Sequence, residues 1–269
     1  MSIKKAGLIA LSLIVLSTLL TAGCVAPSST RRHNEVTLKP GTAEQQVEAF
    51  TNLGAARLMQ GDLAGALSEL SKAEKLNPNN VEVLSYLGLT YYSRKDFDKA
   101  IEYYQKALTL DPSRSEVHNN LGLVYMERKE YDLAKTQFEF CLKDPTYSKP
   151  YLPQFNLGLI EEAQERFEEA IKIYRQIIIS SPQYAPPFFR LGRISYVKGD
   201  YRQAVDFLLN AVRLNTNYTE AYFLLAETYE KLDLKDEAAE SYGQVVVLAP
   251  NTALALEAQM RARKVLGYQ

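Results

Sequence analysis

A leucine followed by a small residue recurs along this chain at a nearly constant interval. The pairs are Leu53-Gly54, Leu87-Gly88, Leu121-Gly122, Leu157-Gly158, Leu191-Gly192 and Leu225-Ala226, with spacings of 34, 34, 36, 34 and 34 residues. An alanine lies 12 residues after each small residue, at Ala66, Ala100, Ala134, Ala170, Ala204 and Ala238. Large apolar residues follow 4 positions later, at Leu70, Tyr104, Phe138, Tyr174, Leu208 and Tyr242. This period predicts a stack of two-helix units, because small residues recur where two helices cross and a large neighbour fills the adjoining groove.

Helix stop and start signals fall at the same interval. Pro78, Pro112, Pro182 and Pro250 close four of the repeats, since proline cannot continue a helix. Three pairs are predicted to form capping boxes that open the next helix: Asn79 with Glu82, Ser113 with Glu116, and Asn217 with Glu220. The third repeat carries two extra residues and the sequence Asp144-Pro145-Thr146 at its end, where we expect a local shift of the array.

This pattern resembles the tetratricopeptide repeat, a helix-turn-helix unit of 34 residues. The resemblance implies an all-α superhelix of six repeats over residues 47–252, with the copies at 47–80, 81–114, 115–150, 151–184, 185–218 and 219–252. Residues 253–269 are predicted to supply a C-terminal capping helix with a charged, solvated outer face. That face would carry Glu257, Arg261, Arg263 and Lys264.

Residues 1–23 have the pattern of a bacterial signal peptide. Lys4 and Lys5 precede an apolar run too short to favour a permanent membrane span. The run ends in Leu20-Thr21-Ala22-Gly23-Cys24, which resembles the lipobox of bacterial lipoproteins, although Thr21 stands where leucine is usual. The resemblance implies a palmitate-bearing lipid on Cys24, followed by a flexible tether over residues 24–46. The alternative is ordinary secretion with Cys24 as a chance residue.

The residue after the cysteine is Val25 rather than Asp. By the sorting rule of Gram-negative lipoproteins, this implies delivery to the periplasmic face of the outer membrane. Loss of Lys4 and Lys5 leaves 29 basic and 32 acidic residues, a formal charge of −3. Such a balance argues against a nucleic-acid partner, which usually requires a basic surface.

No cofactor, metal or catalytic site is expected from the sequence. His33 and His118 are far apart and have no Cys/His cluster nearby. Cys141 falls at a helix-crossing position and is expected in the core. The pairs Glu161-Glu162 and Glu168-Glu169 could be imagined as acid/base dyads, but we interpret them as ordinary surface. An enzyme is therefore not expected.

The first helices of stacked repeats of this kind line a concave face suited to a peptide or partner helix. The fifth, ninth and twelfth residues of the repeats supply the candidate groove, namely Tyr92, Asn119, Met126, Phe155, Leu159, Phe189, Arg193, Tyr196 and Phe223. Phe155, Phe189 and Phe223 form a ladder at 34-residue spacing. These rings either bind a partner or pack between neighbouring first helices, and the sequence leaves both open. Asn119 resembles the asparagine of chaperone-tail clamps, but the matching Lys and Arg residues are missing.

A lipoprotein signal followed directly by six such repeats resembles the pilotin family of type IV pilus biogenesis, represented by PilF, PilW and Tgl. The resemblance implies an outer-membrane lipoprotein whose protein partner is a subunit of the secretin, promoting its localisation and multimerisation. An alternative is a periplasmic adaptor lipoprotein for cell-wall hydrolases or outer-membrane protein assembly. A third possibility, an enzyme with a small-molecule site in the groove, has no constellation of residues to support it.

Overall fold

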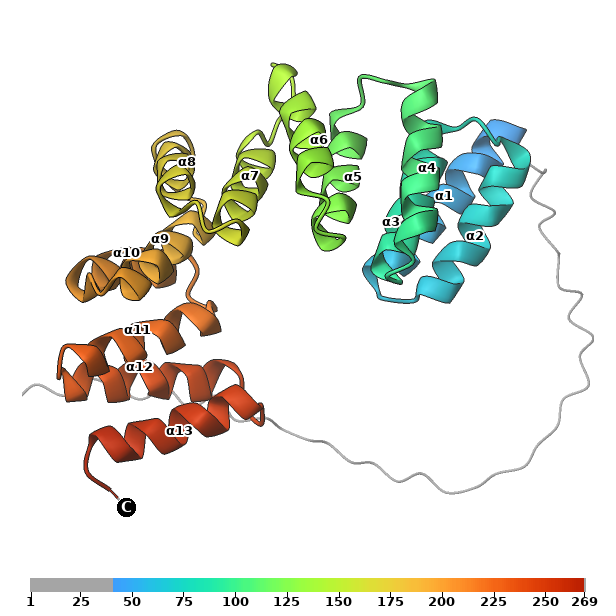
Figure 1. The fold of residues 1–269 in the computed structure, drawn as a ribbon. Coiled ribbons are helices and arrows are strands. Elements are labelled where there is room, and N and C mark those ends of the chain that lie inside the picture. The colour runs from blue at the N-terminus through green and yellow to red at the C-terminus, as the bar shows by residue number, and fades with distance from the viewer. Residues whose placement is uncertain (1–40, 269) are drawn as a thin grey trace, which may run out of the picture. The chain divides into compact units, whose positions relative to one another are not determined.

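The computed structural model describes residues 41–268, and within them the chain forms thirteen α-helices and no strand (Figure 1). The helices are α1 Ala43–Met59, α2 Leu63–Leu76, α3 Val81–Ser93, α4 Phe97–Leu110, α5 Ser115–Glu127, α6 Tyr131–Lys143, α7 Tyr151–Ala163, α8 Phe167–Ser180, α9 Pro186–Lys198, α10 Tyr201–Leu214, α11 Thr219–Lys231, α12 Lys235–Leu248 and α13 Ala253–Val265. They form six helical hairpins followed by a last single helix, which confirms the predicted all-α repeat fold. The predicted signal peptide, Cys24 and most of the predicted tether lie outside the described residues.

Within each hairpin the two helices cross at the small residue of the repeat. The six repeat alanines are fully buried, and a Cβ added to Gly122 would lie 2.6 Å from Cε1 of Phe138. A Cβ on Gly88 would likewise lie 2.7 Å from the ring of Tyr104. Both distances are shorter than carbon atoms tolerate without displacement. The small and large residues of the repeat are thus confirmed as partners in close helix packing.

Contacts between repeats involve the first helices most strongly. Each second helix packs on the first helix of the next repeat, and α1, α3, α5 and α7 also contact one another in succession, as do α9 and α11. No comparable contact joins α7 to α9, and second helices have none with one another. The odd-numbered helices therefore line the inner face of the superhelix.

The three predicted capping boxes are wrong. The residue that caps α3 is Asn80, whose side chain accepts from the N–H of Val83 at 3.0 Å, and α5 and α11 have no side-chain cap. The chain between repeats instead contains a short turn in which Asn77, Asp111, Asp144 and Asn215 accept from the backbone N–H two residues later. Asn79, Ser113 and Asn217 donate their backbone N–H to these turns and so do not cap a helix.

The N-terminal helix begins earlier than the sequence suggested. Residues 43–46, predicted as the end of the tether, belong to α1. Thr42 and Gln45 form a complete capping box at its start, with each side chain bound to the other residue's N–H. This reciprocal pair satisfies two otherwise free donors and moves the helix start upstream of residue 47.

The predicted charged face of the last helix is only partly correct. Arg263 and Lys264 are exposed, but Arg261 turns inward to Glu227 of α11. Leu256 and Met260 are instead 60% and 58% exposed. The helix therefore joins the inner face through Arg261 and presents a mixed apolar and basic surface to solvent.

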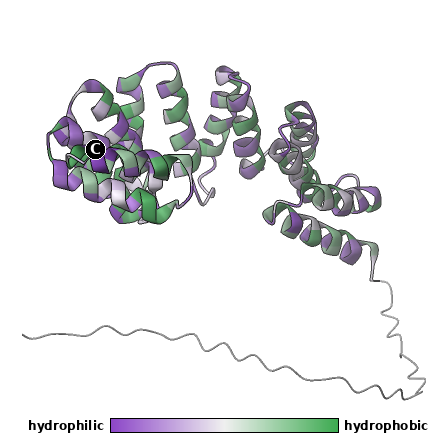
Figure 2. Ribbon diagram, turned by 90° about the horizontal axis from the view of Figure 1, so that it is seen from below, coloured by the Kyte–Doolittle hydropathy of each residue, from purple (hydrophilic) through white to green (hydrophobic). Residues whose placement is uncertain are grey.

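None of the described helices is long and apolar enough to cross a membrane. Figure 2 shows hydrophobic and hydrophilic residues interspersed along the helices, as expected for helices that bury one face against neighbours.

Candidate protein-binding groove

The nine residues predicted to line the groove lie on the odd-numbered helices α3, α5, α7, α9 and α11. Seven of them are partly buried, whereas Asn119 is buried and Arg193 is exposed. Whether any of them contacts a partner stays a prediction. Their intramolecular contacts divide the groove into two chemically different halves.

The three phenylalanines of the ladder pack against tyrosines of their own chain. Ring centroids of Phe155 and Tyr174 are 5.6 Å apart, those of Phe189 and Tyr218 5.0 Å, and those of Phe223 and Tyr242 5.5 Å. These distances and the tilted or edge-on geometries are those of favourable aromatic pairs. The contacts favour the packing interpretation, although each ring keeps some exposed surface.

Glu162 lies at the centre of a polar cluster between the fourth and fifth repeats. Its side chain is only 5% exposed, which overturns its interpretation as ordinary surface. It accepts a hydrogen bond from the Tyr174 hydroxyl at 3.0 Å and another from Arg193, and Arg190 lies 3.8 Å away. Because a buried carboxylate is costly unless it is paired, these partners explain how α7 can bury a charge. The neighbouring Glu161 binds Lys135 at 2.6 Å.

Arg261 organises a second cluster between the sixth repeat and α13. It donates to Glu227 at 2.8 Å and to the Tyr242 hydroxyl at 3.2 Å, and it lies over the ring of Phe223. The Tyr242 hydroxyl in turn donates to Glu230 at 2.5 Å. Burial raises the pKa of Glu227, and the charge of Arg261 opposes that effect. The groove end is thus occupied by the protein's own charges.

The two clusters repeat one arrangement that the sequence reasoning missed. A glutamate at the twelfth repeat position accepts from a tyrosine of its own second helix, and an arginine at the ninth position of the next first helix binds the same region. The members are Glu162 and Glu230, Tyr174 and Tyr242, and Arg193 and Arg261. Each equivalent pair is separated by two repeat lengths in the sequence. That doubled period was the available signal, but it links residue types that were not compared with one another.

The groove of the second and third repeats contains no such charged cluster. The ninth and twelfth positions there are Leu89, Tyr92, Leu123 and Met126, and all four are partly buried and pack against the apolar core. The hydroxyl of Tyr104, equivalent to the bound hydroxyls of Tyr174 and Tyr242, is buried without a hydrogen-bond partner. This half of the groove is therefore apolar and carries an unsatisfied polar group.

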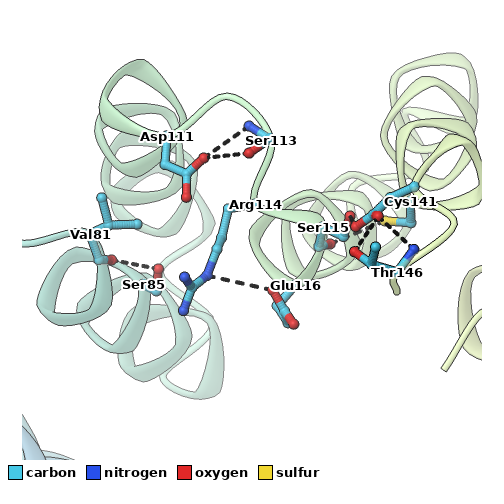
Figure 3. A network of polar contacts seen from close by, with 10 residues as sticks. Val81, Ser85, Asp111, Ser113, Arg114, Ser115, Glu116, Cys141 and Thr146 are labelled. Atoms are coloured by element: carbon cyan, nitrogen blue, oxygen red, sulfur yellow. Dashed lines mark hydrogen bonds and ion pairs between the residues drawn. The ribbon is translucent and has the colours of Figure 1, made fainter. Parts of the chain in front are cut away.

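Cys141 is fully buried, as predicted, and its thiol donates to the carbonyl of Ser115 at 3.1 Å. Burial raises the pKa of the thiol to about 12, so it is not ionised near neutral pH. Figure 3 shows this contact beside Thr146, in the segment that carries the extra residues of the third repeat. The described residues contain no group of His, Cys, Asp and Glu side chains arranged to hold a metal.

Comparison with known proteins identifies the repeats. Models of the tetratricopeptide repeat match residues 81–114, 103–136, 153–184 and 219–252, and a further model described as TPR repeat matches residues 54–94. Together the matched segments span more than half of the chain. The chain belongs to the tetratricopeptide repeat family. As a tetratricopeptide repeat protein it is a protein-binding scaffold, and its candidate site is the groove lined by the first helices.

Several proteins of known sequence or structure resemble this tetratricopeptide repeat chain. A 104-residue segment is 34% identical to human general transcription factor 3C polypeptide 3, covering 37% of this chain and only 12% of the human protein. The crystal structure of PilW, a widely conserved type IV pilus biogenesis factor, has a TM-score of 0.70 at 23% identity over 80% of this chain and 99% of PilW.

Two further structures have a similar fold. Pseudomonas aeruginosa PilF has a TM-score of 0.69 at 20% identity, over 82% of this chain and all of PilF. The quorum sensor NprR from B. thuringiensis has a TM-score of 0.69 at 18% identity, over 83% of this chain and 71% of NprR. At these identities the likenesses establish the fold alone.

Proposed function

We propose that this tetratricopeptide repeat protein is an outer-membrane lipoprotein of type IV pilus biogenesis. It acts as a pilotin: lipid on Cys24 anchors it at the periplasmic face, and its repeats bind a secretin subunit and promote secretin localisation and multimerisation. The observation that carries the proposal is the combination of a lipobox-like sequence ending at Cys24 with a repeat array that matches PilW and PilF over essentially their whole length.

The architecture supports this proposal more than a general scaffold role does. The quorum sensor NprR shares the fold but extends beyond the region of similarity, whereas nearly all of PilW and PilF is covered. A chain made of one anchor signal and one repeat array has two parts, and the pilotin function needs two: attachment to the membrane and capture of a client.

The test is deletion of the gene in its host, followed by membrane fractionation. We expect heat-resistant secretin multimers to disappear from the outer membrane and monomeric secretin to accumulate elsewhere. Persistence of the multimers at the normal level in the outer membrane would contradict the pilotin role. Loss of another envelope process instead would favour an adaptor function.

Replacement of Cys24 by Ala tests the anchor separately. We expect a folded protein that fractionates as a soluble periplasmic species, because removal of the acyl chains removes about 0.8 kcal/mol of membrane affinity per buried methylene. Circular dichroism checks that the repeats remain helical. Tight membrane attachment of the variant would show that Cys24 is not the lipidated residue.

A further inference from the structure

Three tyrosines occupy the same place on the second helices α4, α8 and α12, but only two have a partner for the hydroxyl. Tyr174 donates to Glu162 and Tyr242 donates to Glu230. The hydroxyl of Tyr104 is buried and has no partner within the described residues, although its ring is fully buried like the others. Buried polar groups are normally hydrogen-bonded, so an unpaired one calls for an explanation.

The difference arises from the groove residues around the hydroxyl. At the position of Glu162 and Glu230, the second repeat has Tyr92, which packs against the same apolar cluster as Tyr104 and is half-buried. Where Arg193 and Arg261 stand, the third repeat has Leu123. The intramolecular ion pair of the later repeats is thus replaced by apolar side chains that leave the hydroxyl without an acceptor.

A second unsatisfied group lies on the neighbouring first helix. Oδ1 of Asn119 is buried and has no donor, and Asn119 precedes Leu123 by one turn on α5. The two repeats therefore hold one donor in need of an acceptor and one acceptor in need of a donor. Both belong to the part of the groove that lacks charged clusters.

A cavity of about 200 Å³ opens between α3 and α5 next to these residues. Ser85 and Leu89, which are groove residues of the second repeat, line it together with Asn120 of α5. Arg114 lies at its edge, extended between Ser85 and Glu116 (Figure 3), and its Nε is 3.5 Å from the Glu116 carboxylate. The first helices are therefore incompletely packed where the unsatisfied groups occur.

We propose that the groove of the second and third repeats binds an extended peptide segment of the client through apolar side chains, with one backbone carbonyl accepting from Tyr104 and one backbone N–H donating to Asn119. A peptide backbone carries both groups, and in an extended segment both are free. In a helical segment they are already bonded within the helix, so the pair of unsatisfied groups selects an extended client.

Binding requires one side chain of the free protein to move. The Tyr104 hydroxyl is enclosed, and Tyr92 is the half-buried residue of the groove that lies close enough to affect it electrostatically. Rotation of Tyr92 would expose the hydroxyl to the peptide. The proposal rests on the protein-binding role of the groove and holds for any client, including a secretin subunit.

The experiment uses the mature full-length chain in detergent and a phage-displayed random-peptide library as the probe, so that it does not depend on the client's identity. Selected peptides are synthesised and their affinity is measured by isothermal titration calorimetry. Tyr104→Phe should weaken binding about fivefold through loss of one hydrogen bond. The same variant should raise the melting temperature of the free protein, because it removes an unsatisfied buried hydroxyl.

Tyr174→Phe is the matched control. It removes a hydroxyl that is bonded to Glu162, so it should lower the melting temperature and leave peptide affinity unchanged. Leu123→Glu should abolish binding, with circular dichroism to confirm the fold.

Several outcomes would overturn the proposal. They are enrichment of no peptide, unchanged affinity in Tyr104→Phe, equal weakening by Tyr174→Phe, or selection of peptides that bind as helices. A dimer in light scattering that Leu123→Glu dissociates would also overturn it, because a second copy would then cover the groove. None of these outcomes bears on secretin assembly, so the pilotin proposal can fail or hold independently.

Discussion

At the scale of single residues, the turns within the hairpins impose the sharpest backbone requirement. The residue that follows the first helix has a left-handed conformation in all six repeats, at Gly61, Lys95, Lys129, Glu165, Gly199 and Asp233. Glycine adopts this conformation without steric cost, whereas other residues are strained there. Four of the six turns therefore carry a residue that the backbone does not favour.

Lys95→Gly should stabilise the protein by about 0.5–1 kcal/mol, because the φ of 62° at Lys95 is relieved of its steric cost. Chemical denaturation of wild type and variant measures the change. Gly199→Ala is the control at the equivalent turn and should destabilise by a similar amount, since its φ is 83°. A loss of stability in Lys95→Gly would show that the lysine side chain compensates the strain.

The residue scale also shows what sequence reasoning could reach. The small residues and their large partners were predictable, because steric contact at a helix crossing restricts residue type in every repeat. Glu162 was not, since its burial depends on Tyr174 and Arg193, which lie on two other helices. A glutamate looks like surface until its partners are placed in space.

At the scale of the helices, hairpin geometry depends on close approach at the crossing. Gly122 faces the Phe138 ring and has no space for a methyl group, whereas Gly243 of α12 has no heavy atom near its added Cβ. The two glycines lie on helices but in opposite environments. They form a natural pair for testing the packing.

Gly122→Ala should destabilise the protein by about 1–3 kcal/mol, because the Phe138 ring must shift within a packed core. Gly243→Ala should stabilise it by about 0.5–1 kcal/mol, since alanine is the better helix former and the site is open. Urea unfolding followed by circular dichroism compares the two. Equal effects of both substitutions would mean that the crossing is not tightly packed.

Glu161 links α7 to α6 and to the turn before α8. It is bound by Lys135 and Arg166, and although burial opposes its ionisation, these partners lower its pKa below the ordinary value of 4.5. The unfolded chain therefore takes up this proton at a higher pH than the folded protein. The stabilising contribution is present above the unfolded pKa and is lost as pH falls through the folded pKa.

Glu161→Gln should consequently cost about 0.5–1 kcal/mol at pH 7, a modest value because Arg166 is partly exposed. The difference from wild type should shrink progressively as the pH falls below about 4.5. Unfolding free energies measured across this pH range provide the test, with the exposed Glu139→Gln as control. A difference that does not vary with pH would show that the ion pairs contribute nothing.

At the scale of the whole molecule, the helix order and the six repeats followed from a single period in the sequence. Repeat proteins allow this because each unit contacts mainly its neighbours, so a local pattern determines the array. The division of the groove into an apolar half and a charged half could not be predicted in the same way. It arises where residues such as Glu230 and Arg261 from different repeats meet.

That division gives the repeats different roles. The fourth to sixth repeats use Glu162, Arg193 and Arg261 to hold neighbouring first helices together. The second and third repeats leave Leu123 and Met126 at the groove surface. We expect client capture in the apolar half, while the charged half keeps the geometry of the scaffold.

The most direct test of the whole account is the amount of heat-resistant secretin multimer in the outer membrane of a host strain that carries Leu123→Glu. The account predicts a multimer level as low as in the deletion strain, with the variant itself still folded and membrane-bound. Leu133→Glu, which changes a leucine exposed on α6, should retain the wild-type level. A wild-type multimer level in the Leu123→Glu strain would contradict the claim that this groove captures the client.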